Sequence, residues 1–95
     1  RIEAIFKIAE ILGSEVLYIP ELVFDKEYSA ILKEKIFPKV KKISKNYNNV
    51  EYFDLYNVIE YKSEYFIDKM HFNETGCEIF SEILKTKIIN DYYRL

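Results

Sequence analysis

The sequence predicts an α/β fold with parallel strands, and three observations support this prediction. Helix-like and strand-like segments alternate along the 95 residues. The strand-like segments are short runs of consecutive apolar residues, as in strands that a parallel sheet buries on both faces. With only 2 Gly and 2 Pro, the chain has too few turn residues for a small all-β domain. The alternation indicates right-handed crossovers, with helices on both faces of the sheet.

A helix and a strand are expected in the first 20 residues. Apolar residues recur at helical spacing over residues 2–12, and Gly13 is placed to end this helix in a left-handed conformation. Residues 15–20 read Glu-Val-Leu-Tyr-Ile-Pro, a β-branched and aromatic run that predicts a strand buried on both faces.

A second helix is expected to begin after Asp25, which can cap it. Its predicted core-facing residues are Tyr28, Ile31, Leu32 and Ile36. Because proline cannot continue the hydrogen-bond ladder, we expect a kink or restart at Phe37-Pro38. One or two further turns would carry Val40, Ile43 and Tyr47.

The remaining elements are a strand, a loop and a final helix. Residues 50–55 predict the second strand, and the tyrosine-rich residues 56–67 lack a clear period and predict a loop. A helix is expected from Glu74 to Asp91, with Asn73 as its cap. Its predicted buried residues are Cys77, Phe80, Ile83, Leu84 and Ile88, with Cys77 acting as a small hydrophobic residue.

Two strands alone do not make a stable parallel sheet, because both edges would be open. The chain also begins without Met, directly on a helical pattern. We therefore expect residues 1–95 to be the C-terminal part of one larger three-layer domain, with no interdomain linker.

Composition excludes several classes of protein. A hydrophobic content of 49% argues against disorder of the whole chain. With a net charge of −2, the chain lacks the excess of positive charge that is typical of nucleic-acid-binding proteins. No apolar run approaches the roughly 20 residues that span a bilayer. The single cysteine and single histidine exclude an internal disulfide and a Cys/His zinc site. The lysines of Lys39–Lys45 form either a solvated helix face or a phosphate site.

The segment from Asp68 to Gly76 carries the candidate chemistry. His71, the only histidine, follows Asp68 by three residues, in a loop just before a helix. Loops at the carboxyl edge of a parallel sheet commonly hold active sites. A carboxylate that accepts a hydrogen bond from one ring nitrogen lets the other act as a base. We therefore expect His71 to be a general base and Asp68 its orienting partner, with Gly76 permitting a close approach of the backbone.

Asp68-x-x-His71-x-Asn73-x-x-Gly76, followed by an amphipathic helix, resembles the last conserved block of the SGNH (GDSL-type) hydrolases. The resemblance implies a flavodoxin-like α/β/α domain in which this block supplies the acid and base of a Ser-His-Asp triad. It further implies a serine esterase or acyltransferase that acts on O-acyl esters, including acylated carbohydrates, without a cofactor. Asn73 and Gly76 would be supporting residues of this site.

The nucleophile and oxyanion blocks of that family are absent from these residues. Five serines fall on predicted helices, before a strand or on a polar loop, and none is assigned as nucleophile: Ser14, Ser29, Ser44, Ser63 and Ser81. The chain is therefore expected to supply the His-Asp half of the triad, to be inert alone, and to need the N-terminal half of the domain as its partner. The compartment stays open.

Alternative interpretations remain. Asp68 could simply cap a turn beside an ordinary loop histidine, and a metal held by Asp68, His71 and Cys77 would have a poor ligand set. The chain could instead be a non-catalytic α/β module that forms homo-oligomers through its open strand edge. An aromatic groove for an acyl or sugar group is suggested by Tyr52, Tyr56, Tyr61, Tyr65 and Phe66, although core packing would also explain them.

Overall fold

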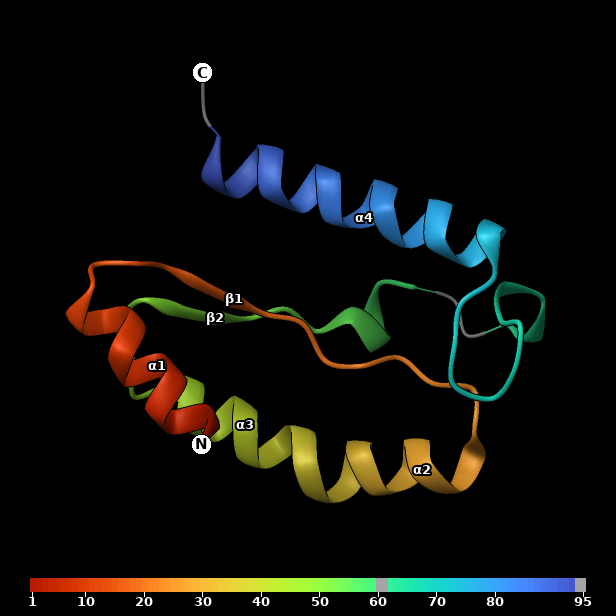
Figure 1. Cartoon of the computed structure of the whole chain (residues 1–95), viewed down its shortest axis with the longest axis horizontal. Helices are drawn as coiled ribbons and strands as arrows, with labels where there is room; N and C mark the ends of the chain where they lie inside the picture. The colour runs from red at the N-terminus through yellow and green to blue at the C-terminus, as the bar shows by residue number, and fades with distance from the viewer. Residues whose placement is uncertain (60–61, 94–95) are drawn as a thin grey trace.

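The structure of the protein, a computed structural model, describes residues 1–59 and 62–93 (Figure 1). Its helices are α1 (Ile2–Ile11), α2 (Lys26–Ile31), α3 (Phe37–Ser44) and α4 (Glu74–Tyr92), and its strands are β1 (Val16–Tyr18) and β2 (Val50–Tyr52). A π-helical segment, Leu32–Ile36, joins α2 to α3, and two short 3-10 helices, Leu55–Asn57 and Ser63–Tyr65, lie in the predicted loop. No helix in the described part of the chain has the length and apolar character needed to cross a membrane.

The two strands pair in parallel, which confirms an α/β fold. Val16 pairs with Val50 and Tyr18 with Tyr52. Figure 1 shows the strands between α4 on one side and α2 and α3 on the other. All six strand residues are only half-buried, so the prediction of a strand buried on both faces was wrong for β1. The physical reason is that two short strands make a sheet too narrow for the flanking helices to enclose.

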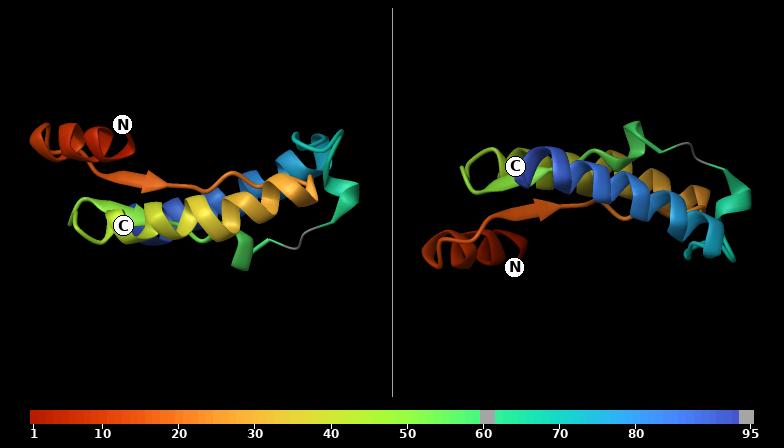
Figure 2. Two further views of the ribbon diagram at one scale, coloured as in Figure 1. Left: turned by 90° about the horizontal axis from the view of Figure 1, so that it is seen from below. Right: turned by 90° about the horizontal axis from the view of Figure 1, so that it is seen from above.

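Helix α1 ends as predicted, because Gly13 has a φ of +73°. Phe6 is fully buried, with its ring 6.5 Å from that of Tyr18 and 5.7 Å from that of Tyr47. Four further apolar residues of this first segment lie in solvent: Ile5, Ile8, Ile11 and Leu12. Their spacing places them on one face of the helix, beside the face that holds Phe6. Figure 2 shows α1 and β1 at one margin of the molecule.

The helix from Lys26 to Ser44 begins as predicted but buries a different face. Asp25 caps it, since its Oδ1 accepts a hydrogen bond from the Tyr28 amide at 2.9 Å. Leu32 is buried as expected, whereas Tyr28, Ile31 and Ile36 are exposed, so the predicted core face was wrong at these three positions. Phe37 and Val40 supply the buried contacts instead.

The restart expected at Phe37-Pro38 is confirmed, and it follows directly after the π-helical segment. The Phe37 amide donates to the Leu32 carbonyl, five residues earlier, and α3 restarts with Pro38 in its first turn. A proline is tolerated in the first turn of a helix, because the backbone N–H groups there have no acceptor within the helix and the missing N–H of proline therefore costs no hydrogen bond.

The main core lies between α4 and the segments that follow the two strands. Its buried residues are Leu22, Leu55, Ile59 and Phe66. From α4, Ile79, Phe80 and Ile83 pack against this cluster while remaining partly exposed. Leu84 and Ile88 are also only half-buried, so the prediction that this helix buries its apolar face was too strong. At the far end of α4, Lys87 pairs with Glu51 and Asp91, and the Tyr92 hydroxyl donates to Glu51 at 2.5 Å.

Candidate functional site

The Asp68–His71 segment forms the tip of a closed loop beyond the carboxyl ends of the strands. Phe66 and Phe72 form an antiparallel bridge at its base, and the Ile67 amide donates to the His71 carbonyl at 2.9 Å. The loop docks on the segment that follows β1, where the amides of residues 24 and 25 both donate to the Lys69 carbonyl, at 2.8 and 2.9 Å. The loop therefore lies at the edge of the sheet where the sequence predicted it.

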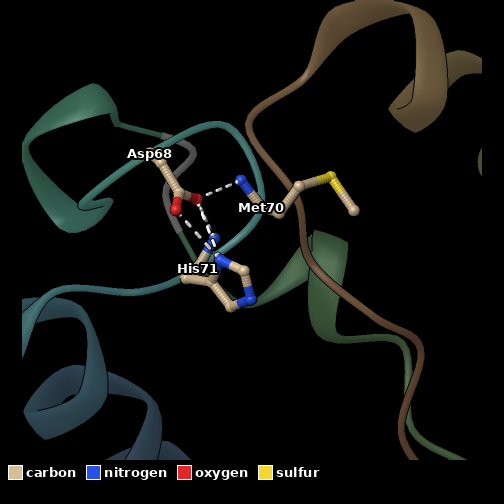
Figure 3. Close-up of polar contacts among 3 residues, drawn as sticks. All are labelled: Asp68, Met70 and His71. Atoms are coloured by element: carbon tan, nitrogen blue, oxygen red, sulfur yellow. Dashed lines mark hydrogen bonds and ion pairs between the residues drawn. The ribbon is translucent and has the colours of Figure 1, made fainter.

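Asp68 and His71 face one another as the spacing predicts. The His71 Nδ1 lies 3.0 Å from Oδ1 and 3.1 Å from Oδ2 of Asp68 (Figure 3). The same Oδ1 accepts hydrogen bonds from the backbone amides of Met70, at 2.8 Å, and of His71, at 2.9 Å. One carboxylate thus closes the turn and fixes the imidazole ring.

The pKa of Asp68 lies below its ordinary value. The largest cause is the hydrogen bond from the Met70 amide, followed by the bond from the His71 side chain, because both favour the charged carboxylate. Asp68 is therefore an acceptor at neutral pH. With its hydrogen on Nδ1, His71 donates to Asp68 and keeps a lone pair on Nε2.

The Nε2 atom of His71 points away from Asp68 (Figure 3). The two side chains are exposed, His71 at 74% and Asp68 at 55%. Within residues 1–59 and 62–93, no hydroxyl donates to this nitrogen. Ser29 and Ser44 are buried in the α2–α3 helix, and Ser14, Ser63 and Ser81 are exposed. The pair is assembled, and no serine among the described residues is hydrogen-bonded to it.

Asn73 and Gly76 hold the loop against α4. Asn73 caps the helix as predicted, since its Oδ1 accepts from the Gly76 amide at 2.8 Å. Its Nδ2 also donates to the Glu64 carbonyl at 2.6 Å. A Cβ atom on Gly76 would lie 2.2 Å from the Tyr65 carbonyl oxygen, so only glycine fits, and the close approach expected at this position is confirmed.

An open, mostly apolar groove of about 500 Å³ lies beside His71. The segment after β1 forms one wall with Ile19 and Leu22, and α4 forms another with Phe80. Cys77 also lines the groove and is exposed, so the prediction of a buried cysteine was wrong. The reason is that the first turn of α4 faces the groove, where the rest of the described chain leaves it uncovered.

Of the aromatic residues predicted to line a ligand groove, Tyr52, Tyr56, Tyr65 and Phe66 do not line the groove beside His71. Tyr52 and Tyr56 line a separate groove with Lys33 and Lys41, and Tyr61 lies outside the described residues. Residues 19–22 and the Met70 amide belong to the His71 site, although no motif pointed to them. No group of three or more potential metal-ligating side chains occurs in the described part of the chain.

Comparisons with protein-family models, with curated proteins and with solved structures found no match.

Proposed function

We propose that this chain is the acid–base half of an SGNH-type serine esterase or acyltransferase. In this proposal, residues 1–95 are the C-terminal part of a three-layer flavodoxin-like domain, and β1 continues the sheet through its unpaired edge. The substrate is an O-acyl ester, including esters of carbohydrates.

The observation that carries the proposal is the contact of the His71 Nδ1 with both oxygens of Asp68, at 3.0 and 3.1 Å. A carboxylate in this position fixes the ring and stabilises the imidazolium that forms during acyl transfer. The His71 side chain is 74% exposed, and His71 lines the apolar groove. The two amide hydrogen bonds that hold the Asp68 carboxylate in the turn also keep it beside the imidazole ring.

The proposed reaction uses the two residues in order. A serine from the N-terminal half bonds to the ester carbonyl carbon, and its hydroxyl proton passes to the Nε2 atom of His71. The proton then passes to the departing alkoxide as the ester C–O bond breaks. Asp68 stays ionised throughout and stabilises the protonated ring. Water or an acceptor alcohol then releases the acyl group by the same steps.

The test is ester turnover by the protein in which this chain is joined to its N-terminal half. We expect His71→Ala to lower kcat by roughly 10³-fold or more and Asp68→Asn by roughly 10²-fold or more. A fluorophosphonate probe, which reacts with activated serines, should label the wild type and fail to label His71→Ala. The 95-residue chain alone should neither turn over the ester nor bind the probe covalently.

Glu64→Gln provides a matched control. Glu64 is also an exposed carboxylate near the loop, and among the described residues its side chain pairs only with Lys62, at 3.7 Å. This variant should keep wild-type turnover. Full activity of a folded His71→Ala protein would remove His71 from the mechanism and overturn the proposal.

A second candidate function is a non-catalytic module that associates through the edge of β1. The observation that favours it is the apolar surface of Ile5, Ile8 and Leu12, on the helix that precedes this strand. This function requires self-association that His71→Ala leaves unchanged, together with no ester turnover by the protein.

A further inference from the structure

The groove beside His71 is assembled from three segments that lie far apart in the sequence. Ile19 and Leu22 follow β1, Met70 belongs to the loop of His71, and Phe80 belongs to α4. The volume of the groove, about 500 Å³, lies within the range of roughly 300–1,000 Å³ that is typical of small-molecule sites. The acetyl group of an acetate ester would fill only a small part of it.

The lining of this groove offers few polar groups. Among the described residues that line it, Glu21 and His71 carry the charged or titratable side chains besides the Cys77 thiol, and the other side chains are apolar. A ligand with many hydroxyl groups would give up hydrogen bonds to water on entering and would find few in exchange. A hydrocarbon chain gives up none and removes apolar surface from water. The lining therefore favours a hydrocarbon chain over a sugar ring.

The apolar walls combine an adaptable side chain with a fixed aromatic surface. The Met70 side chain is exposed, while its backbone amide is held by Asp68 at 2.8 Å. A methionine side chain has several rotatable bonds and adapts to ligands of different shape. Phe72 and Phe80, which both line the groove, stack with their ring centres 5.8 Å apart. Such walls can hold a linear chain in more than one conformation.

The position of His71 decides which part of an ester would enter the groove. In the reaction proposed above, the ester carbonyl lies between the serine of the N-terminal half and His71, which itself lines the groove. One of the two groups joined by the ester can therefore extend into it. The alcohol of a carbohydrate ester carries several hydroxyls, whereas an aliphatic acyl chain carries none. The apolar lining thus matches the acyl side of the ester.

We propose that this groove binds the acyl chain of the ester substrate and makes the enzyme selective for linear aliphatic acyl groups longer than acetyl. This inference rests on the proposed esterase or acyltransferase function and names its acyl group. The apolar side chains of the lining contact the chain, and the alcohol part of the ester stays outside the groove. Each methylene that enters removes further apolar surface from water, so the selectivity rises with chain length until the groove is full.

The first test is a chain-length series with the protein in which this chain is joined to its N-terminal half. The probes are the acetate, butyrate and octanoate esters of p-nitrophenol, with each rate divided by that of uncatalysed hydrolysis. We expect kcat/KM to rise by about threefold to fourfold for each added CH₂ group from acetate to butyrate, and to be higher still for octanoate. A kcat/KM for octanoate no higher than that for acetate would overturn the proposal.

A bulky side chain in the groove should remove this selectivity. Cys77 is exposed and lines the groove, so Cys77→Trp fills part of the space for the acyl chain. We expect the ratio of kcat/KM for octanoate to that for acetate to fall at least about tenfold. Thr75→Trp adds the same ring at an exposed position of the same helix, outside the groove, and should keep the wild-type ratio. Equal ratios in the two variants would count against the groove as the acyl site.

Alkylation of the folded protein makes the same test without a folding step. N-ethylmaleimide should modify Cys77, the only cysteine of this chain, and lower the octanoate-to-acetate ratio. Cys77→Ser should abolish this response. If mass spectrometry found Cys77 unmodified in the folded, joined protein, the N-terminal half would cover the groove and the proposal would be overturned.

The two proposals fail in different ways. Full turnover by a folded His71→Ala protein would overturn both, because the acyl site depends on a reaction at His71. An essential His71 together with equal turnover of acetate and octanoate would overturn the acyl-chain proposal alone and leave the esterase function standing.

Discussion

Asp68 makes the folding stability of its loop dependent on pH. Its pKa is lowered by the Met70 amide first and by His71 second, so its charged form is favoured in the folded chain. The stability that it contributes is fully present above the pKa of the unfolded chain, about 4, and is lost as the pH falls through the lower folded value. We therefore expect Asp68→Asn to destabilise the chain at pH 6 and to do so progressively less toward pH 2, in urea unfolding at each pH. If the difference in free energy of unfolding between wild type and Asp68→Asn stayed constant from pH 6 to pH 2, the charged Asp68 carboxylate would not be what stabilises the loop.

Gly76 is the residue whose replacement should damage the site without touching its chemistry. The Cβ of an alanine would lie 2.2 Å from the Tyr65 carbonyl oxygen and 2.7 Å from a carbon of the Phe72 ring, so the loop would have to move away from α4. We expect Gly76→Ala to lower the free energy of unfolding by about 2–3 kcal/mol. Thr75→Ala, at an exposed neighbouring position, should change it by less than about 0.5 kcal/mol. Equal free energies of unfolding for the two variants would show that the loop can move away from α4 without loss of stability.

The sequence predicted the members of this site better than its surroundings. The contact of Asp68 with His71 and the cap from Asn73 to Gly76 were predicted because both are local and depend on turn and cap geometry. The groove beside them depends on Ile19 and Leu22, about fifty residues earlier in the chain. Contacts between residues so far apart in the chain follow from the tertiary fold, so no local sequence pattern could predict them. The exposure of Cys77 was missed for the same reason.

At the scale of elements, the first turn of α4 depends on one side chain with two roles. Asn73 caps the helix through the Gly76 amide and donates to the Glu64 carbonyl, tying α4 to the preceding 3-10 helix. We expect Asn73→Ala to destabilise the chain by about 1–2 kcal/mol, measured by urea unfolding. Asn90→Ala, an exposed asparagine near the other end of the same helix, should be neutral or slightly stabilising. If the two asparagines proved equivalent, the cap would not be what holds this turn.

The α2–α3 helix shows why helical periodicity failed over one element. A regular period of 3.6 residues, started from Leu32, carries the apolar face to Ile36. In the structure, the Phe37 amide instead bonds five residues back, to Leu32, and this wider turn rotates Phe37 into the core and leaves Ile36 exposed. Pro38 predicted an irregularity in this helix. Its position could not show whether the chain would kink at the proline or form a wider turn before it.

At the scale of the whole molecule, the sheet is the least complete part. The alternation of elements predicted the parallel pairing of β1 and β2, which the register confirms. It also predicted strands enclosed on both faces, which two half-buried strands do not achieve. Val16 and Tyr18 share backbone hydrogen bonds with residues 49 and 53 of the β2 segment, so by alternation the backbone groups of Leu17 face the unpaired edge. This open edge supports the proposal that further strands complete the domain.

Figure 2 shows α1 and β1 at the same margin of the molecule. The exposed apolar residues of α1 and the open edge of β1 together predict self-association of the isolated chain. Ile5 and Ile8 are both 57% exposed, so covering them in a dimer removes apolar surface from water. We expect sedimentation of the 95-residue chain to show association that strengthens with concentration, and Ile5→Glu/Ile8→Glu to weaken it by at least about tenfold, because the charges would have to be desolvated. Ile31→Glu/Ile89→Glu changes two isoleucines with 49% and 48% exposure on other helices, and should associate like the wild type. If the chain stayed monomeric at all concentrations, or if both double variants weakened association equally, the chain would not associate through this margin.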